Sequence, residues 1–210
     1  MALHYETLVS GPMENNMYLL WDDAQPGADS ASTGTRPVML IDAATDAPLI
    51  KKSLDEGAFD LQAVVTTHRH WDHVEALEEI LNTYKVPHYA SAEEADLYPV
   101  APTNPLSDGS HIDFAGHKLP VFIVHGHTEG GAVIEATIDG VPHLFVGDNL
   151  FPGGVGKTNS PEEFTTLWTD VVTKIFEQYP DETVVLPGHG KSTTLGAERP
   201  HLDEWKQRGW

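Results

Sequence analysis

The sequence predicts an α/β protein that folds as a four-layer αβ/βα sandwich, with two mixed sheets flanked by outer helices. Two observations support this fold class. Short apolar runs with the length of buried strands alternate with amphipathic helical patterns. The alternation recurs in each half of the chain, so each half is expected to supply one sheet and its outer helices. A chain of 210 residues can bury a substantial core, and we expect residues 1–210 to form one domain.

The first half is expected to open with three strands, a short helix, a fourth strand and a second helix. In order, these elements are His4–Val9, Met17–Trp21, Val38–Ile41, Pro48–Glu56, Ala63–Thr66 and Val74–Tyr84. The second helix carries Val74, Leu77, Ile80 and Leu81 on one face, which should pack on the sheet. Residues 22–37, between the second and third strands, are polar and rich in small side chains. This composition is typical of a flexible insertion within a hairpin.

The second half repeats the theme with strands, a long helix, a further strand and a final helix. In order, these elements are His111–Phe114, Lys118–Val124, Ala132–Ile138, Val141–Val146, Pro161–Gln178, Val184–Pro187 and Glu198–Lys206. Most of the apolar runs lead into loops that contain glycine. The loops of both halves are therefore expected to meet along one edge of the sandwich.

The segment Thr-His-Arg-His-Trp-Asp-His at positions 67–73 places three histidines and a carboxylate within six residues. If strand geometry continues from the preceding strand, His68 and His70 point to the same side. Asp72 and His73 follow where a helix would begin, and a turn there aims both at the same pocket. A solvated polar turn is the alternative interpretation, but this density of ligands favours a metal site large enough for two ions. Imidazole and carboxylate without thiolate suit zinc, iron or manganese about equally.

Three further candidate ligands follow apolar runs in the second half: His127, Asp148 and His189. A glycine near each one lets the backbone turn sharply and approach an ion closely. His125 lies two residues from His127 and could replace it if the loop had a different register. The other histidines are expected mostly on the surface or at strand edges, at His4, His88, His111, His117, His143 and His201.

Together these motifs resemble those of the metallo-β-lactamase-fold hydrolases, and they are most similar to the small glyoxalase II-like branch. The resemblance runs from Gly11 to Gly190. It implies that His68, His70 and His127 hold one metal ion, that Asp72, His73 and His189 hold a second, and that Asp148 bridges both. The loop Phe151–Thr158 resembles the substrate-side loop of this branch, in which Lys157 stands at the position of a basic residue that contacts the substrate.

The resemblance implies a metal-dependent hydrolase with two divalent ions, for which zinc is expected first and iron or manganese are alternatives. Two ions about 3.5 to 4 Å apart can share a bridging water and lower its pKa. The expected nucleophile is this bridging hydroxide, which would attack a thioester or ester as in hydroxyacyl-thiol hydrolysis by glyoxalase II. Asp72 and Asp148 are the candidate catalytic carboxylates, and Trp71 and Lys157 are the candidate substrate contacts.

Other substrates and functions stay open. Glyoxalase II carries a C-terminal helical extension that binds glutathione, and this sequence ends about twenty residues after His189, so another thioester, a lactone or a small ester is also possible. A persulfide dioxygenase on the same fold binds one iron, for which His68, His127 and Asp148 would suffice. A β-lactamase is disfavoured because the chain has no cysteine ligand and because Asp148 supplies a bridging aspartate. A non-catalytic metal-binding protein is disfavoured because all seven ligand positions are intact.

Charge and composition narrow the partners. The chain has 12 Lys and Arg against 32 Asp and Glu, for a formal charge of -20. This charge repels a phosphate backbone, so we expect a small-molecule substrate and no nucleic acid. No apolar run is long enough to span a bilayer, and the first residues lack the pattern of a signal peptide, so a cytoplasmic protein without membrane contact is expected. The sequence leaves the oligomeric state open.

Overall fold

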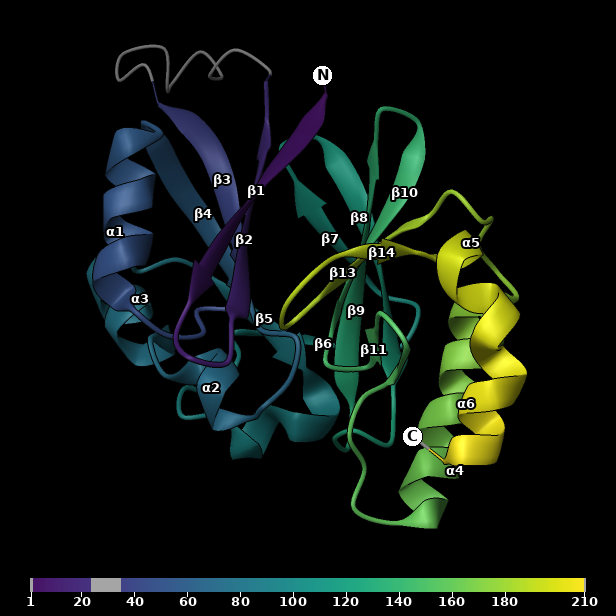
Figure 1. Cartoon of the computed structure of the whole chain (residues 1–210). Helices are drawn as coiled ribbons and strands as arrows, with labels where there is room; N and C mark the ends of the chain where they lie inside the picture. Colours follow the sequence, from purple (N-terminus) through teal and green to yellow (C-terminus); the bar gives the residue numbers. More distant parts are fainter. Residues whose placement is uncertain (1, 24–34, 210) are drawn as a thin grey trace.

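Two six-stranded sheets lie face to face with helices on both outer sides (Figure 1). This computed structural model describes residues 2–23 and 35–209. Both sheets mix parallel and antiparallel pairs. The arrangement confirms the αβ/βα sandwich that the sequence predicted.

The first sheet has the strand order β1-β2-β3-β4-β5-β6. Its strands are β1 (Leu3–Ser10), β2 (Asn15–Asp22), β3 (Arg36–Ile41), β4 (Phe59–Val65), β5 (His88–Ser91) and β6 (Asn104–Leu106). The pairs from β1 to β3 are antiparallel, whereas those from β3 to β6 are parallel. A helical segment crosses over between each parallel pair, as parallel pairing requires.

The second sheet has the order β14-β13-β10-β9-β8-β7. Its strands are β7 (His111–Phe114), β8 (His117–Val124), β9 (Gly131–Ile138), β10 (Val141–Gly147), β13 (Val184–Pro187) and β14 (Thr193–Thr194). Only β10 and β13 pair in parallel. A small hairpin of β11 (Leu150–Phe151) and β12 (Gly154–Val155) follows β10 and begins the loop that contains Lys157.

Helices cover the outer faces of both sheets. The helical segments of the described chain are α1 (Ala47–Glu56), α2 (Trp71–Val74), α3 (Leu77–Tyr84), η1 (Ala92–Leu97), α4 (Pro161–Asp170), η2 (Val171–Phe176), α5 (Leu195–Glu198), η3 (Arg199–His201) and α6 (Leu202–Arg208). In Figure 1, α1 and α3 lie outside the first sheet, and α4 and α6 lie outside the second. Within the described ranges, none of these helices combines the length and apolar character needed to cross a membrane.

Alternating side chains of the central strands separate three apolar cores. On β3, Ile41 packs between the sheets, whereas Leu40 packs among the side chains of α1 and α3. On β9, Ile134 faces the first sheet, whereas Val133 packs among residues of α4 and α6. Because successive side chains point to opposite faces of a strand, each sheet contributes to two cores, and four layers result.

The predicted helix over residues 74–84 is wrong in one respect, because it is two helices. The chain leaves α2 after Val74 and enters α3 at Leu77. Between them, the Ala76 N–H donates to the carbonyls of Ala43 and Ala44 in the loop before α1. That tertiary contact takes the place of a helical hydrogen bond. Similarly, the predicted helix over 161–178 is α4 followed by the π-helical turn η2.

Three other expectations have different outcomes. His88, expected at the surface or a strand edge, is buried on β5 and contacts Thr66 Oγ1 through Nε2 at 2.9 Å. Of the predicted insertion at residues 22–37, Asp22 ends β2, and β3 begins at Arg36. Residues 24–34 lie outside the described residues. The expectation of one domain over residues 1–210 stays a prediction.

Replacing Ile134 by Ala should destabilise the inter-sheet core. Ile134 is 0 % exposed, so Ile134→Ala removes buried methyl groups, leaves a cavity and should lower the free energy of unfolding by about 2 to 5 kcal/mol. Urea denaturation followed by circular dichroism measures the change. Thr137→Ala, at an exposed position of the same strand, is the control and should change it by less than about 0.5 kcal/mol. Equal effects of the two substitutions would contradict the assigned faces of β9.

Candidate metal centre

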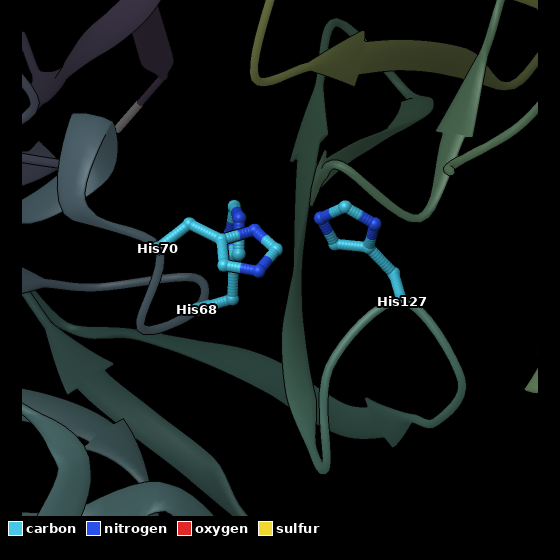
Figure 2. A group of neighbouring side chains, drawn as sticks. All are labelled: His68, His70 and His127. Carbon is cyan, nitrogen blue, oxygen red and sulfur yellow. The ribbon is translucent and has the colours of Figure 1, made fainter. Parts of the chain in front are cut away.

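The candidate metal centre lies where strand ends of both sheets meet. Residues 67–73 follow β4 of the first sheet, whereas His127, Asp148 and His189 follow β8, β10 and β13 of the second. Figure 2 shows His68 and His70 on one side and His127 facing them from the other. One site therefore takes its side chains from both halves of the chain.

Strand periodicity does not explain how His68 and His70 come together. The expectation that strand geometry runs into the motif is wrong, because β4 ends at Val65 and both histidines lie in the loop before α2. Their ring centroids are nevertheless 4.9 Å apart. Asp72 and His73 lie on α2, where the short helix turns their side chains back into the same cluster.

The seven candidate ligands form three overlapping groups. The groups are His68, His70 and His127; His68, His73 and Asp148; and Asp72, His73 and His189. Within each group, one potential ligand atom from each residue lies within 4.8 Å of the others. His68 and His73 each belong to two groups, so the three form one continuous cluster.

The Asp148 carboxylate lies in the middle of this cluster. Its Oδ1 is 3.4 Å from His73 Nε2, and its Oδ2 is 3.3 Å from His189 Nε2 and 3.8 Å from His127 Nε2. Asp72 Oδ2 approaches His189 Nε2 at 3.2 Å from another side. Asp148 can therefore reach ligands of both proposed ions, as its bridging role requires.

Contacts at Nδ1 orient four of the five histidines. These contacts are His73 to Asp42 Oδ2 at 3.0 Å, His68 to Thr67 Oγ1 at 3.1 Å, His127 to the Lys157 carbonyl at 2.7 Å, and His189 to the Met13 carbonyl at 2.9 Å. Each acceptor fixes the proton of a neutral ring on Nδ1. Nε2 then keeps its lone pair, which is the arrangement that a metal ligand needs.

Buried ligand atoms without partners fit bound metal ions. Within the part of the chain that the structure describes, Nε2 of His68, Nε2 of His127 and Oδ1 of Asp148 are buried without a hydrogen-bond partner. Leaving one such atom unsatisfied is unfavourable by about 1 to 3 kcal/mol. Coordination of divalent cations would satisfy all three. The donor set of imidazole and carboxylate leaves the identity of the metal open among zinc, iron and manganese.

Charge pairing governs the protonation of the metal-free cluster. Burial alone would lower the pKa of His73, but Asp148 and Asp42 outweigh it and raise the pKa to about 10. Asp148 also raises the pKa of His189 against the effect of burial. Burial, assisted by the charge of His73, holds the pKa of His68 well below its usual range. The proton on His73 therefore balances the charge of the Asp148 carboxylate.

Two residues that sequence reasoning missed hold the second ligand group in place. Asp42 accepts hydrogen bonds from Thr67 N at 2.7 Å and Thr67 Oγ1 at 2.8 Å, in addition to its contact with His73. Asn15 Nδ2 donates to Asp72 Oδ2 at 3.0 Å and to the Asp72 carbonyl at 3.1 Å. A carboxylate directly after the third predicted strand was the available signal for Asp42. The pairing of Asn15 with Asp72 spans 57 residues and has no local signal.

A third missed residue, Glu94, joins the two loops of the first ligand group. Its carboxylate is fully buried and accepts from the backbone N–H of Arg69 at 3.0 Å and of Gly130 at 3.0 Å. Tyr98 adds a hydrogen bond from its hydroxyl at 3.1 Å. Arg69 is next to His70, and Gly130 lies three residues after His127. Glu94 therefore sets the distance between these two ligands.

Glycines allow the close approaches that the cluster requires. A Cβ at Gly188 would lie 2.2 Å from Asp148 Oδ1 and 2.6 Å from His73 Cε1. Such contacts are too short for any side chain, so the backbone before His189 can reach the cluster only as glycine.

The remaining candidate residues lie around the cluster. Trp71 is 66 % exposed, and the side chain of Lys157 is also exposed, so both are accessible to a substrate, and their contact with one stays a prediction. His125 belongs to none of the three ligand groups. Its Nδ1 contacts Asp170 at 2.6 Å and its Nε2 contacts Glu93 at 3.2 Å, so the alternative role of His125 as a ligand is not favoured.

Residues 15–189, which include every candidate ligand, match the family model of the metallo-beta-lactamase superfamily. The chain belongs to this superfamily. The hydroxyacylglutathione hydrolase of Roseobacter denitrificans is 34% identical over 157 residues, which are 75% of this chain and 59% of that protein. Hydroxyacylglutathione hydrolase GloC of Haemophilus influenzae is 24% identical over 220 residues, which cover 94% of this chain and 95% of that protein.

The overall fold agrees with the assignment to this superfamily. The crystal structure of BLEG-1 B3 metallo-beta-lactamase aligns with a TM-score of 0.81, over 96% of this chain and 99% of that chain, at 22% identity. At this identity the similarity concerns the fold alone. The chain is thus a hydrolase of the metallo-beta-lactamase superfamily, whose fold and ligand groups imply divalent metal ions.

Metal binding should release protons at neutral pH. His73, with its pKa raised to about 10, is protonated at pH 7, and its Nε2 must lose the proton to become a ligand. The apparent metal affinity should therefore rise with pH between about 6 and 10. Calorimetric titration of the metal-free protein in buffers of different ionisation enthalpy should give at least one proton released per chain at pH 7. An enthalpy independent of the buffer would contradict the charge pairing.

Glu94→Gln should weaken the first ligand group, because its amide places a donor against one of the two backbone N–H groups. We expect metal affinity to fall by about 10- to 100-fold, as for other partners of ligand-bearing segments. Titration with Co²⁺, followed by its visible absorption, measures both the affinity and the ligand geometry. Glu78→Gln, at an exposed position of α3, is the matched control and should bind like the wild type. If Glu94→Gln binds Co²⁺ with the affinity and spectrum of the wild type, the positioning role of Glu94 is contradicted.

Proposed function

We propose that this protein hydrolyses a small acyl-thiol conjugate, such as a hydroxyacyl thioester, at a site with two divalent metal ions, of which zinc is expected first. The similarity to two hydroxyacylglutathione hydrolases supports the substrate class. The observation that carries the proposal is the Asp148 carboxylate, which lies between the ligand groups of both ions. Water contributes its oxygen to the acyl carbon, the carbon–sulfur bond breaks, and an acid and a thiol are formed.

When bound, two divalent ions acidify a water molecule and polarise a substrate carbonyl. The chain supplies only two carboxylates to the seven-residue ligand set, Asp72 and Asp148, and its five imidazoles are neutral ligands. Such a set leaves a strongly electropositive centre, which stabilises negative charge that develops on a carbonyl oxygen. Asn15 and Asp42 keep Asp72 and His73 in fixed orientations, so the centre is preorganised before the substrate binds.

The same ligand set favours a thiolate leaving group. In the described part of the cluster, every imidazole and carboxylate is a candidate ligand, so none remains free as a general acid. A thiolate needs little protonation as it leaves, whereas an amine requires a proton. This difference supports a thioester over an amide as the substrate. Trp71 and Lys157 are proposed to contact the substrate from the exposed rim.

Metal analysis combined with two substrates tests the proposal. The purified protein should contain two metal ions per chain and release thiol from S-lactoylglutathione or a related thioester. A thiol reagent can follow the reaction without interference, because the chain has no cysteine. One iron per chain with formation of sulfite from glutathione persulfide would instead indicate the dioxygenase. If the metal-loaded protein turns over no thioester, no persulfide and no β-lactam, the result would indicate a non-catalytic metal-binding protein.

Asp148→Ala and His73→Ala should each remove hydrolysis and lower the metal content, because each removes a ligand from the middle of the cluster. The loss of activity should exceed about a hundredfold, as expected for the removal of an electrostatic element of a catalytic site. Asp203→Ala, in the exposed first turn of α6, serves as the control and should keep both activity and metal. Full activity of the metal-analysed Asp148→Ala protein would contradict the assignment.

A further inference from the structure

A cavity of about 350 Å³ opens beside the first ligand group. Its wall includes His70 and His127 on one side and the N-terminal part of α4 on another. A substrate whose carbonyl reaches the metal centre can extend into this space. The chemical character of the cavity therefore bears on the part of the substrate that it holds.

Away from the metal ligands, the wall of this cavity has an excess of negative charge. Arg69 is its only lysine or arginine. Both nitrogens that it directs at Glu129 are engaged, with Nε at 2.7 Å and Nη2 at 2.9 Å from the two carboxylate oxygens. The charges of Arg69 and Glu129 cancel, which leaves the negative charges of Glu162 and Glu163 on α4. The Glu163 carboxylate accepts from the backbone N–H of Asn159 at 2.6 Å, whereas Glu162 is exposed and has no ion pair within the described chain.

Of the three histidines in the wall, His70 and His127 are candidate metal ligands, and His125 does not offset these carboxylates. His125 lies between Asp170, at 2.6 Å, and Glu93, at 3.2 Å. The His125 ring therefore pairs with two carboxylates that are not part of the cavity wall. Lys157 is not part of the cavity wall, and its carbonyl, rather than its ammonium group, contacts His127.

His127 connects this cavity to the metal centre, because it lines the cavity and is also a candidate ligand of the first ion. Its side chain is 8 % exposed, and its Nε2 has no hydrogen-bond partner within the described chain. The His127 loop also packs tightly on α4, since a Cβ at Gly126 would lie 2.5 Å from the Glu163 carbonyl. The acidic turn of α4 is therefore held at a fixed position beside the reactive end of the substrate.

We propose that this cavity binds the thiol half of the substrate and that this half carries a cationic ammonium group. The inference rests on the proposed thioester hydrolysis. An ammonium group in the cavity would meet the carboxylate of Glu162, which has no ion pair within the described chain, and that of Glu163 beside it. A thiol half that bears a carboxylate and no ammonium group, by contrast, would be repelled by the same residues. The cavity thus selects its leaving group by charge, whereas the metal centre selects the thioester bond.

Three thioesters with one acyl group and different thiols test the inference. The thiols are thiocholine, its uncharged isostere 3,3-dimethylbutanethiol, and anionic 3-mercaptopropionate. We expect kcat/KM to be about three- to tenfold higher for the thiocholine ester than for its isostere, because the cavity carboxylates are partly exposed and solvent weakens their effect. The mercaptopropionate ester should be the slowest. The preference should shrink as the ionic strength rises.

Substitution of Glu162 tests whether this residue is the source of the preference. Glu162→Gln should reduce the thiocholine preference at least twofold, and Glu162→Lys should reverse it in favour of mercaptopropionate. Glu182→Gln, at an exposed position away from the cavity wall, is the control and should keep the wild-type ratio. The metal content of each variant is measured, so that an altered centre is recognised.

The possible outcomes separate the two proposals. Hydrolysis of all three esters at equal rates overturns the charge selection and leaves the hydrolase assignment intact. A preference for mercaptopropionate that disappears in Lys157→Met overturns it too, because the thiol half then lies beside Lys157 and outside the cavity. Failure of the metal-loaded protein to cleave any thioester overturns the proposed function, and this inference with it.

Discussion

The pairing of the largely buried Asp148 carboxylate with histidines that follow strands of both sheets is the constraint on which the site depends. Asp148 follows β10 of the second sheet, yet its Oδ1 faces His73, which lies on α2 after the first sheet. A carboxylate at this depth is strongly unfavourable unless cations or protonated groups surround it. The loops of both halves therefore converge on Asp148, and protons or metal ions complete the charge balance between them.

Residues that bind no metal themselves make this convergence precise enough for chemistry. Asp42 holds His73 and Thr67 while its own backbone has a φ of 59°, in the left-handed region that disfavours side chains. The hydrogen bonds of its carboxylate offset this strain. Glu94 performs the corresponding task for the His70 and His127 loops. Each proposed ion thus has one carboxylate that positions its ligands without binding the ion, namely Glu94 for the first ion and Asp42 for the second.

Local sequence patterns predict the ligands, but they do not predict the residues that position these ligands. His68, His70, Asp72 and His73 could be predicted because they are nearly consecutive, and His127, Asp148 and His189 because a glycine accompanies each after an apolar run. Glu94 acts through backbone groups 25 and 36 residues away, so only the tertiary structure reveals its role.

Similar reasons explain where the fold departs from prediction. The apolar face of residues 74–84 has continuous helical spacing, but a contact of Ala76 with the loop before α1 divides the helix. The strands β5 and β6 have four and three residues, too few for a periodic pattern. The acidic cavity has no local sequence signal either, because Arg69, Glu129 and Glu162 belong to three separate segments of the chain.

A crystal structure of the metal-loaded protein, with anomalous scattering recorded at the absorption edge of the metal, tests the central claim most directly. The predicted result is two peaks about 3.5 to 4 Å apart. One should be bound by His68, His70 and His127, the other by Asp72, His73 and His189, and Asp148 should contact both. A single peak, or a peak to which Asp148 is not bound, would contradict the two-ion centre.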